Sequence, residues 1–457
     1  MRRIGKYEIL GLLGRGGMGR VYKVRLPVAG RMLALKLLAP DETLTAILGE
    51  TEVRRMFTEE AALIGGLRHP RVAAVTDFDH DARGRPFYCM EFFCRNLGVI
   101  LGESYRAEEP ARALPVETAA RLALETLDGV ALLHAKGLLH RDLKPFNVML
   151  DDEEHAKLID FGLSARRGER RATPGGLAIG TPFYTAPEQE TDPDSATERS
   201  DLFSVGVICW RMLTGRLPGE RADERRKPSS LAPELFHAFD EFLPRAVHPE
   251  PERRFSSAED MQMALSDALD DWRAAMRGAC SLAEEEPLRA DAANVRPRET
   301  PRKVAASEAS QAFPLDSLWR PLPGPIPELK LLRRDGARLV VDAANGLCWQ
   351  QGGSPQLLTR FEAEEYCAKL NETRFAGRSG WRLPTVEELC LIIRRGDGAD
   401  AYCADPLFDH RQKRLWSADA KSGRASWCAD AVLGHVTHMD NDCLAHVRAV
   451  CRTDGPA

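Results

Sequence analysis

The sequence predicts an α+β protein made of two separate domains, and three observations lead to this prediction. Segments typical of strands come first and segments typical of helices follow, which indicates a small β-rich lobe and then a larger helical lobe over residues 7–275. A polar stretch rich in Ala, Arg, Glu and Pro then predicts a flexible linker over 276–327. Residues 328–453 regain apolar segments and hold seven of the 11 cysteines, which predicts a second, smaller α+β domain.

Composition and charge exclude several classes of protein. The 457 residues are 44% hydrophobic and 29% charged, which is typical of globular chains and excludes wholesale disorder. The net charge of −5 argues against a nucleic-acid-binding protein. No apolar run reaches the ~18 residues of a membrane span, and the segment 202–213 is expected as a buried helix. With no signal peptide at the N-terminus, we expect a cytoplasmic protein without a disulfide framework.

The elements of the first domain follow from periodicity and from glycine placement. Gly137 and Gly215 are placed to end helices, and Ser200 is expected to cap the start of one. The strands expected in this domain cover 7–13, 21–26 and 31–38, and its main helices cover 52–67, 117–136 and 201–214.

A glycine pattern lies in the turn between the first two expected strands. Gly14, Gly16 and Gly19 form G-x-G-x-x-G, which alone is a weak signal because it also marks dinucleotide-binding folds and ordinary turns. In a dinucleotide-binding fold a helix follows the third glycine, whereas here the strand-like segment 21–26 follows. A strand–turn–strand hairpin can lay backbone N–H groups over the phosphates of a nucleotide.

Lys36 lies inside the apolar strand that follows the glycine pattern. It can face solvent at the edge of a sheet, or it can pair with phosphate oxygens if a carboxylate orients it. Glu59 and Glu60 on the helix 52–67 are the two candidates for that carboxylate.

The segments HRDLKPFNVML (140–150) and DFG (160–162) form the most specific pattern in the chain. Asp142 can accept a proton from an attacking hydroxyl, and Lys144 can neutralise a transferring phosphoryl group. Asn147 and Asp160 offer the oxygen ligands that Mg²⁺ prefers. The spacing of Asp142 and Asp160 leaves room for a short hairpin that returns both side chains to one cleft.

Together with GTPFYTAPE (180–188), Asp201 and Arg254, these motifs make residues 7–275 resemble a eukaryotic-type (Hanks-type) bacterial serine/threonine protein kinase. The resemblance implies a bilobal kinase fold, ATP and Mg²⁺ as cofactors, and phosphoryl transfer to Ser or Thr hydroxyls of protein substrates, with autophosphorylation expected. It also implies that Glu60 orients Lys36 and that Arg254 pairs with Glu188. The alternative is a non-catalytic, nucleotide-binding pseudokinase scaffold, which the complete set of motif residues disfavours.

The resemblance assigns a role to each matching position. Glu91 and Phe93 are expected to hydrogen-bond adenine through their backbone groups, and Thr173 and Thr181 are alternative phosphorylation sites in the activation segment. The expected catalytic residues are Asp142, Lys144, Lys36 and Glu60, and the expected metal ligands are Asn147 and Asp160. The expected cofactor-binding residues are Leu13, Gly14, Arg15, Gly16, Gly17, Met18, Gly19, Arg20, Val21, Ala34, Lys36, Glu91 and Phe93.

The last third of the chain is marked by GWRLPTVEEL (380–389), in which Thr385 and Glu388 predict a helix start with a capping box. With the other Trp- and Cys-containing segments of 328–453, it resembles the Lcl C-terminal-like family, which implies a C-type-lectin-like fold. We expect this domain to bind or sense an unknown ligand or protein. Its cysteines contain no C-x-x-C pair, so buried thiols are expected rather than a metal site, with disulfide pairing as the open alternative.

Overall fold

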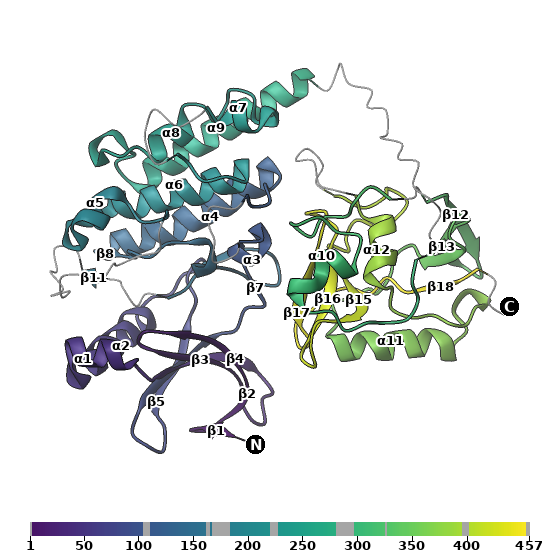
Figure 1. The fold of residues 1–457 in the computed structure, drawn as a ribbon, viewed down its shortest axis with the longest axis horizontal. Helices are drawn as coiled ribbons and strands as arrows, with labels where there is room; N and C mark the ends of the chain where they lie inside the picture. Colours follow the sequence, from purple (N-terminus) through teal and green to yellow (C-terminus); the bar gives the residue numbers. More distant parts are fainter. Residues whose placement is uncertain are drawn as a thin grey trace. The chain divides into compact units, whose positions relative to one another are not determined.

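The computed structural model describes residues 2–103, 110–160, 165–166, 183–219, 227–279, 297–324, 327–394 and 402–453. The chain forms two compact units, residues 1–280 and residues 281–457, drawn in purple to teal and in green to yellow in Figure 1.

The first unit begins with a six-stranded antiparallel sheet in the order β1-β2-β3-β4-β6-β5. Leu33, Leu35 and Leu37 of β4 face a core with Val24 and Phe87. Because side chains alternate along a strand, Lys36 of β4 must lie on the other face of the sheet. The strands are β1 (Arg3–Ile4), β2 (Tyr7–Gly16), β3 (Gly19–Arg25), β4 (Met32–Leu38), β5 (Val75–His80) and β6 (Pro86–Glu91).

Two helices accompany the sheet, α1 (Glu42–Leu48) and α2 (Glu50–Gly65). The buried side of α2 carries Phe57 and Glu60, and the Phe57 ring packs against Tyr88 of β6 with centroids 5.3 Å apart. The same helix face therefore contributes an apolar anchor and a buried carboxylate.

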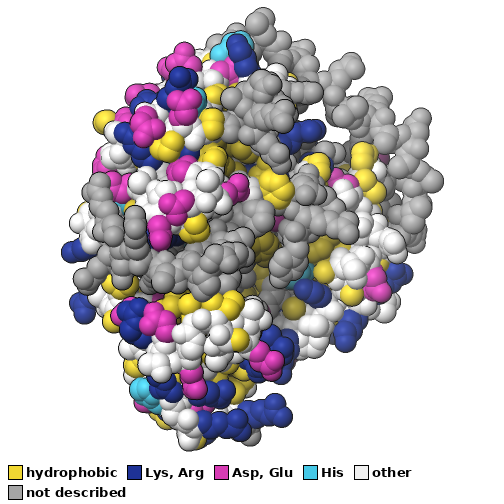
Figure 2. Space-filling view, turned by 60° about the vertical axis from the view of Figure 1, so that its left-hand side comes forward, with side chains coloured by type: hydrophobic (Ala, Val, Ile, Leu, Met, Phe, Trp, Pro, Cys, Tyr) yellow, Lys and Arg dark blue, Asp and Glu magenta, His cyan; other side chains and the backbone are white. Residues whose placement is uncertain are grey.

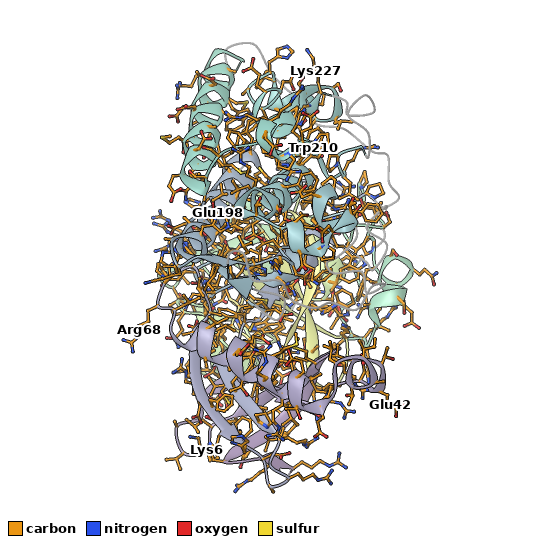
Figure 3. The ribbon with its side chains drawn as sticks, turned by 90° about the vertical axis from the view of Figure 1, so that its left-hand side faces the viewer. Lys6, Glu42, Arg68, Glu198, Trp210 and Lys227 are labelled. Atoms are coloured by element: carbon orange, nitrogen blue, oxygen red, sulfur yellow. The ribbon has the colours of Figure 1, made fainter. Side chains whose placement is uncertain are left out.

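The second lobe of the first unit is helical, and three long helices form its centre: α4 (Val116–Ala135), α6 (Glu198–Thr214) and α9 (Ala258–Ala279) (Figure 1). Every residue of α6 from position 200 to position 214 is buried, and Figure 3 shows Trp210 inside this lobe. The expected core helix is therefore present. The shorter helices are α3 (Leu97–Leu101), α5 (Pro187–Thr191), α7 (Pro228–Leu231) and α8 (Phe242–Ala246).

The ends of these helices match the expected glycines but not the expected N-cap. Gly137 and Gly215 adopt φ values of 68° and 67°, the left-handed conformation that glycine takes without strain. Ser200 was predicted to cap α6, and this is wrong: the helix begins at Glu198, three residues before the expected start, and its N-cap is Thr197. Ser200 lies inside the first turn, where its hydroxyl accepts a hydrogen bond from the Thr197 backbone N–H at 3.0 Å.

Short strands and single helical turns connect the two lobes and the long helices. Two small sheets, β10-β9-β7 and β11-β8, flank the segment 140–147. The strands are β7 (Arg95–Asn96), β8 (Leu138–Leu139), β9 (Val148–Leu150), β10 (Ala156–Leu158) and β11 (Ala165–Arg166). The 3₁₀ turns are η1 (Pro145–Asn147), η2 (Pro193–Ser195), η3 (Pro233–Leu235) and η4 (Pro251–Arg253).

The second unit contains a four-stranded sheet, β12-β13-β14-β18, and a three-stranded sheet, β15-β16-β17. Its core includes Trp349 of β14, Leu389 of α12 and Trp427 of β16. The strands are β12 (Leu329–Arg334), β13 (Ala337–Asp342), β14 (Leu347–Gln350), β15 (Arg414–Ala420), β16 (Ala425–Asp430), β17 (His435–Asp440) and β18 (Val450–Arg452). The helices are η5 (Ala306–Glu308), α10 (Ala309–Ala312), α11 (Arg360–Glu372), η6 (Phe375–Gly377) and α12 (Val386–Ile392).

The prediction of a flexible linker over 276–327 is wrong for residues 297–324, which fold with the second unit. Val304, Phe313 and Leu315 are at most 4% exposed and belong to its core. The Phe313 ring meets the edge of Trp427, with centroids 5.5 Å apart. Polar composition misled the prediction because a few apolar anchors, widely spaced in a polar segment, are enough to bind it to an existing core.

The helix predicted at the WRLPT segment is confirmed. The Thr385 hydroxyl accepts a hydrogen bond from the Glu388 N–H, and Glu388 accepts one from the Thr385 N–H at 2.9 Å. This reciprocal pair is the expected capping box.

Charge and hydropathy of the described residues add two findings. None of the helices in the described part of the chain is long and apolar enough to cross a membrane. On the face of the first unit seen in Figure 2, acidic and basic side chains are interspersed.

Candidate active site

The glycine pattern lies where β2 turns into β3, and the register pairs Gly14 with Val21 and Gly16 with Gly19. A Cβ atom added to Gly19 would come within 2.4 Å of the Leu37 carbonyl oxygen, so the close approach of β3 to β4 requires a glycine there. A Cβ atom on Gly14 or Gly16 would meet nothing within 4 Å. Packing inside the chain therefore explains only the third glycine, and the first two leave open backbone beside the hairpin.

Lys36 lies on the same face of the sheet as Val21, which follows the glycine pattern. Its neighbours across the ladder are Val21 on β3 and Tyr88 on β6, and directly opposed residues in an antiparallel pair share a face. Ala34, two residues earlier on β4, faces the same way opposite Met90. The expected cofactor-binding residues Val21 and Ala34 and the expected catalytic Lys36 therefore lie on one surface.

Two carboxylates contact the Lys36 ammonium group. Lys36 Nζ lies 2.7 Å from Glu60 Oε1 and 3.1 Å from Asp160 Oδ1, although the two acids are far apart in the sequence. Burial would lower the pKa of Lys36, but the negative charges of Asp160 and Glu60 raise it well above its usual value. The Lys36 charge in turn lowers the pKa of Asp160, so this cluster holds one cation and at least one carboxylate in their charged forms.

Glu60, rather than Glu59, is the partner of Lys36. Glu60 is 2% exposed on the inner side of α2, and Tyr88 donates a hydrogen bond to its Oε1 at 2.8 Å. Glu59 lies on the outer side of the helix in an exposed ion pair with Arg55. Tyr88 was missed by the sequence reasoning, because an aromatic residue in an apolar strand carries no signal of the carboxylate that it will contact.

The segment 140–147 gathers three of the expected side chains. Lys144 Nζ lies 2.7 Å from Asp142 Oδ2. The Asn147 amide group donates to the Asp142 backbone carbonyl at 2.8 Å and to its carboxylate at 3.2 Å. These donations use the Asn147 nitrogen, so its oxygen Oδ1 stays available as an acceptor or ligand.

Asp201 at the start of α6 fixes the segment 140–147 through hydrogen bonds to its backbone. Its carboxylate accepts hydrogen bonds from the backbone N–H groups of His140 and Arg141, each at 2.9 Å, and from the His134 ring. Burial would raise the pKa of Asp201, but the His134 contact and the backbone donors lower it, so the carboxylate stays ionised. Arg141 and Asp160 have φ values of 66° and 62°, a conformation that costs a non-glycine residue energy and needs such support.

The expected pairing of Arg254 with Glu188 is confirmed. The two form a bidentate ion pair with both N–O distances at 2.7 Å, and Ser200 donates a third hydrogen bond to Glu188. The Arg254 side chain is fully buried, and its guanidinium group also lies over the Phe203 ring. This pair ties α5 to the loop before α9.

Three more of the expected cofactor-binding residues lie on or next to β2 and β6, and the two expected phosphorylation sites are not among the described residues. Leu13 is 47% exposed on β2. Glu91 is the last residue of β6, and Phe93 lies between β6 and β7. The alternative phosphorylation sites Thr173 and Thr181 lie outside the described residues.

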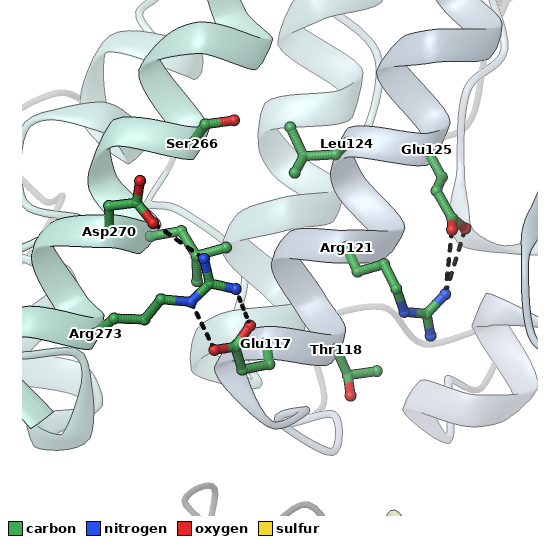
Figure 4. A pocket seen from close by; sticks show the side chains of 9 residues that line it. Glu117, Thr118, Arg121, Leu124, Glu125, Ser266, Asp270 and Arg273 are labelled. Atoms are coloured by element: carbon green, nitrogen blue, oxygen red, sulfur yellow. Dashed lines mark hydrogen bonds and ion pairs between the residues drawn. The ribbon is translucent and has the colours of Figure 1, made fainter. Parts of the chain in front are cut away.

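Two pockets in the first unit lie away from Lys36 and Asp142. One, of about 510 Å³, lies between α4 and α9, where Arg273 bridges Glu117 and Asp270 and Arg121 contacts Glu125 (Figure 4). A smaller one, of about 180 Å³, adjoins Glu91 and Phe93 from the side of Asp151 and Asp152. Neither contains an expected catalytic residue.

Comparison with known proteins decides the family. The protein kinase domain family matches residues 7–270, which is more than half of the chain, and the Lcl C-terminal domain family matches residues 338–451. The chain belongs to the protein kinase family. Its bilobal kinase fold, predicted from the motifs, is confirmed by this match.

Three curated relatives of this kinase chain come from bacteria. Serine/threonine-protein kinase PknH of Mycobacterium bovis is 28% identical over 349 residues, which cover 71% of this chain and 54% of the relative. PknD of Mycobacterium tuberculosis is 32% identical over 280 residues, covering 58% and 40%, and PksC of Streptomyces coelicolor is 32% identical over 276 residues, covering 56% and 48%. The kinase chain thus spans about half the length of the curated relatives it matches.

Among solved structures, the Mycobacterium tuberculosis PknI kinase domain matches 58% of this kinase chain and 98% of its own length. The sequence identity is 23% and the TM-score is 0.43.

Proposed function

We propose that this protein is an active serine/threonine protein kinase that transfers the γ-phosphoryl group of ATP to Ser or Thr hydroxyls and phosphorylates itself. The observation that carries the proposal is the convergence of the buried Lys36 and Glu60 with the half-exposed Asp160 in one charge cluster. The names of the curated relatives support the same activity and favour it over a pseudokinase scaffold.

The residues fit ATP with Mg²⁺ on three grounds. The backbone at Gly14 and Gly16 has open space beside it, which suits close approach of phosphate groups. Asn147 Oδ1 and the 47%-exposed Asp160 carboxylate are hard oxygen donors of the kind that Mg²⁺ binds. The apolar face at Val21 and Ala34 suits a flat base, whose edge the backbone of Glu91 and Phe93 would hydrogen-bond. When bound, Mg²⁺ would offset the negative charge of the phosphates.

In the proposed mechanism the chain mainly positions groups and supplies charge, because phosphoryl transfer needs little covalent help from the protein. Lys36, held by Glu60, would fix the phosphates of the nucleotide. Asp142 would orient the attacking hydroxyl and take its proton, and Lys144 beside it would stabilise the negative charge that develops on the transferring group.

The test is transfer of ³²P from γ-labelled ATP to the purified full chain and to a general Ser/Thr substrate protein. We expect incorporation on Ser or Thr in the wild-type chain, and a loss of roughly 10³-fold or more with Asp142→Asn at an unchanged melting temperature. Wild-type protein that binds ATP but incorporates no phosphate would show that the fold is a scaffold and would overturn the proposal. Phosphopeptide mapping of the product would decide between Thr173 and Thr181.

For the second unit we propose a binding or sensing role with an unidentified partner. The match of residues 338–451 to the Lcl C-terminal domain family supports a distinct module, and the C-type-lectin-like fold remains a prediction. The test compares the full chain with a chain ending at residue 280. Equal kinase activity and equal sets of bound proteins would contradict the proposal.

A further inference from the structure

Two cysteines of the second unit face each other across neighbouring strands. Cys348 on β14 and Cys451 on β18 are directly opposed in the antiparallel ladder, between the pairs Leu347–Arg452 and Trp349–Val450. Directly opposed residues place their side chains on the same face of the sheet. Both cysteines are reduced, and both are at most 1% exposed.

The hydrogen bonds of the ladder set the distance between their backbones. Gln350 N donates to Ala449 O, and Thr453 N donates to Gly346 O, each at 3.0 Å. Hydrogen-bonded and non-hydrogen-bonded pairs alternate along an antiparallel ladder, so the Cys348–Cys451 pair between them is also hydrogen-bonded. Such pairs have Cα atoms about 5.5 Å apart, which lies within the range that disulfides span.

The surroundings of the two thiols make them chemically unequal. Interaction between the two sulfur atoms lowers the pKa of Cys348 and raises that of Cys451. The positive charges of Arg378 and Arg334 lower the pKa of Cys348 further. Arg378 is fixed beside the pair because its Nη1 donates to the backbone carbonyls of Arg452 and Thr453, at 3.4 and 3.1 Å. A thiolate beside cations is the reactive form of cysteine.

We propose that Cys348 and Cys451 form a reversible redox site that closes to a disulfide when a small peroxide oxidises it. The Cys348 thiolate attacks one oxygen of hydrogen peroxide, the O–O bond breaks, and the product is a Cys348 sulfenic acid with hydroxide, which takes a proton to become water. The Cys451 thiol then gives up its proton and attacks the Cys348 sulfur, so that the S–S bond forms and a second water leaves. Two thiols lose two electrons and the peroxide gains them. A small dithiol reverses the change by thiol–disulfide exchange.

Disulfide formation would tie β14 to the last strand of its sheet and close a loop of roughly 100 residues. A cross-link over a loop of this length stabilises a fold mainly by restricting the unfolded chain. We expect the melting temperature of the second unit to rise by about 5–10 °C on oxidation.

The experiment uses the full-length chain, reduced, freed of reductant, and treated with a small excess of hydrogen peroxide. Remaining thiols are blocked with N-ethylmaleimide, and the digest is analysed by mass spectrometry without reduction. We expect a linked peptide pair containing Cys348 and Cys451 that separates after treatment with dithiothreitol. Finding both cysteines fully blocked while methionines in the same sample are oxidised would overturn the proposal.

Three variants assign the roles of the two thiols. With Cys451→Ser, a sulfenic acid should accumulate on Cys348 and be trapped by dimedone, whereas Cys348→Ser should leave Cys451 unmodified. Cys367→Ser is the matched control, because Cys367 is buried in the same unit with its pKa raised to about 12 by burial. This control should keep the Cys348–Cys451 link. Loss of the link in Cys367→Ser, or a Cys367–Cys451 link in the wild-type chain, would refute the proposed pairing.

Discussion

Both units bury charged side chains. The Glu388 and Asp419 network of the second unit and the Glu60 cluster of the first differ in whether every carboxylate oxygen has a hydrogen-bond partner. In the second unit, Glu388 and Asp419 are fully buried, and each carboxylate oxygen accepts at least one hydrogen bond. Arg382 binds Glu388 with two hydrogen bonds of 2.6 and 2.7 Å, and Arg298 pairs with Asp419 at 3.0 Å. In the first unit, Glu60 Oε2 is buried and has no hydrogen-bond partner among the described residues.

This difference in hydrogen bonding distinguishes charged groups that stabilise the fold from charged groups that are available to bind a ligand. A buried carboxylate whose two oxygens both accept hydrogen bonds from the fold has its charge compensated there, so the Glu388 and Asp419 network is structural. The cluster of Lys36 and Asp160 keeps a half-exposed carboxylate beside open glycine backbone. Buried atoms without a partner among the described residues also occur in the second unit, for example Arg378 Nε and Arg448 Nη1, so the unpartnered Glu60 oxygen is informative only together with the half-exposed Asp160 beside it.

The largest expected effect is a loss of stability when the Asp419 network of the second unit is broken. Asp419→Ala would leave the N–H groups of Arg302 and Val386 without their acceptor and would remove one of the two carboxylate partners of Arg298. We expect the second unit to lose about 3–5 kcal/mol of stability, measured by chemical unfolding, with ATP turnover by the first unit unchanged. Glu364→Ala, which removes only a surface pair with Arg360, should change stability by no more than about 0.5 kcal/mol. Equal effects of the two substitutions would show that the network is not structural.

The incomplete network should respond in activity rather than in stability. Glu60→Gln keeps the shape of the side chain but removes the charge that orients Lys36, and we expect ATP turnover to fall by about 10²-fold. The adjacent Glu59→Gln is the matched control, since Glu59 forms an exposed ion pair with Arg55 and its substitution should leave turnover unchanged. Steady-state kinetics of both variants measure the turnover, and melting temperatures check that they fold. Equal turnover of the two variants would contradict the prediction.

Acid should weaken the second unit through His438. Burial and the nearby Lys421 ammonium group, whose Nζ lies 2.9 Å from the ring, lower the pKa of His438 to about 4. The unfolded chain, with a histidine pKa near 6.5, then binds the proton more strongly than the folded one. Stability is therefore fully present above about pH 6.5 and falls as the pH drops toward 4, by up to about 3 kcal/mol.

His438→Asn should flatten this part of the pH profile, measured by urea unfolding between pH 7 and pH 4. An identical slope in the variant would assign the acid sensitivity to other groups.

The smallest expected effect concerns helix capping in the second unit. Thr385→Ala removes the side chain that accepts the Glu388 N–H at the start of α12, and such a loss costs about 1 kcal/mol. Thr385→Ser keeps the hydroxyl and should restore most of the stability. Thermal unfolding of the two variants distinguishes the cap from the loss of the methyl group.

Much of the candidate site could be predicted from the sequence because its motifs are short and local. Asp142 and Asn147 lie close together in the sequence, within the segment 140–147. The alternation of side chains along β4 decides which face of the sheet carries Lys36. Tyr88 and Asp201 were not assigned their supporting roles, because their contacts with Glu60 and His140 join segments far apart in the sequence. Residues 297–324 were misassigned for the same reason: nothing in their composition reveals the core that Phe313 enters.

By itself, the sequence determined the order of strands and helices in the first unit, the residues that form its chemical motifs, and the capping box at Thr385. These features depend on residue type and on spacings of a few positions, which a chain carries locally. Only the tertiary structure decided where the second unit begins and which cysteine faces Cys451. Each of these depends on packing and strand register, which arise when distant segments bury their surfaces together.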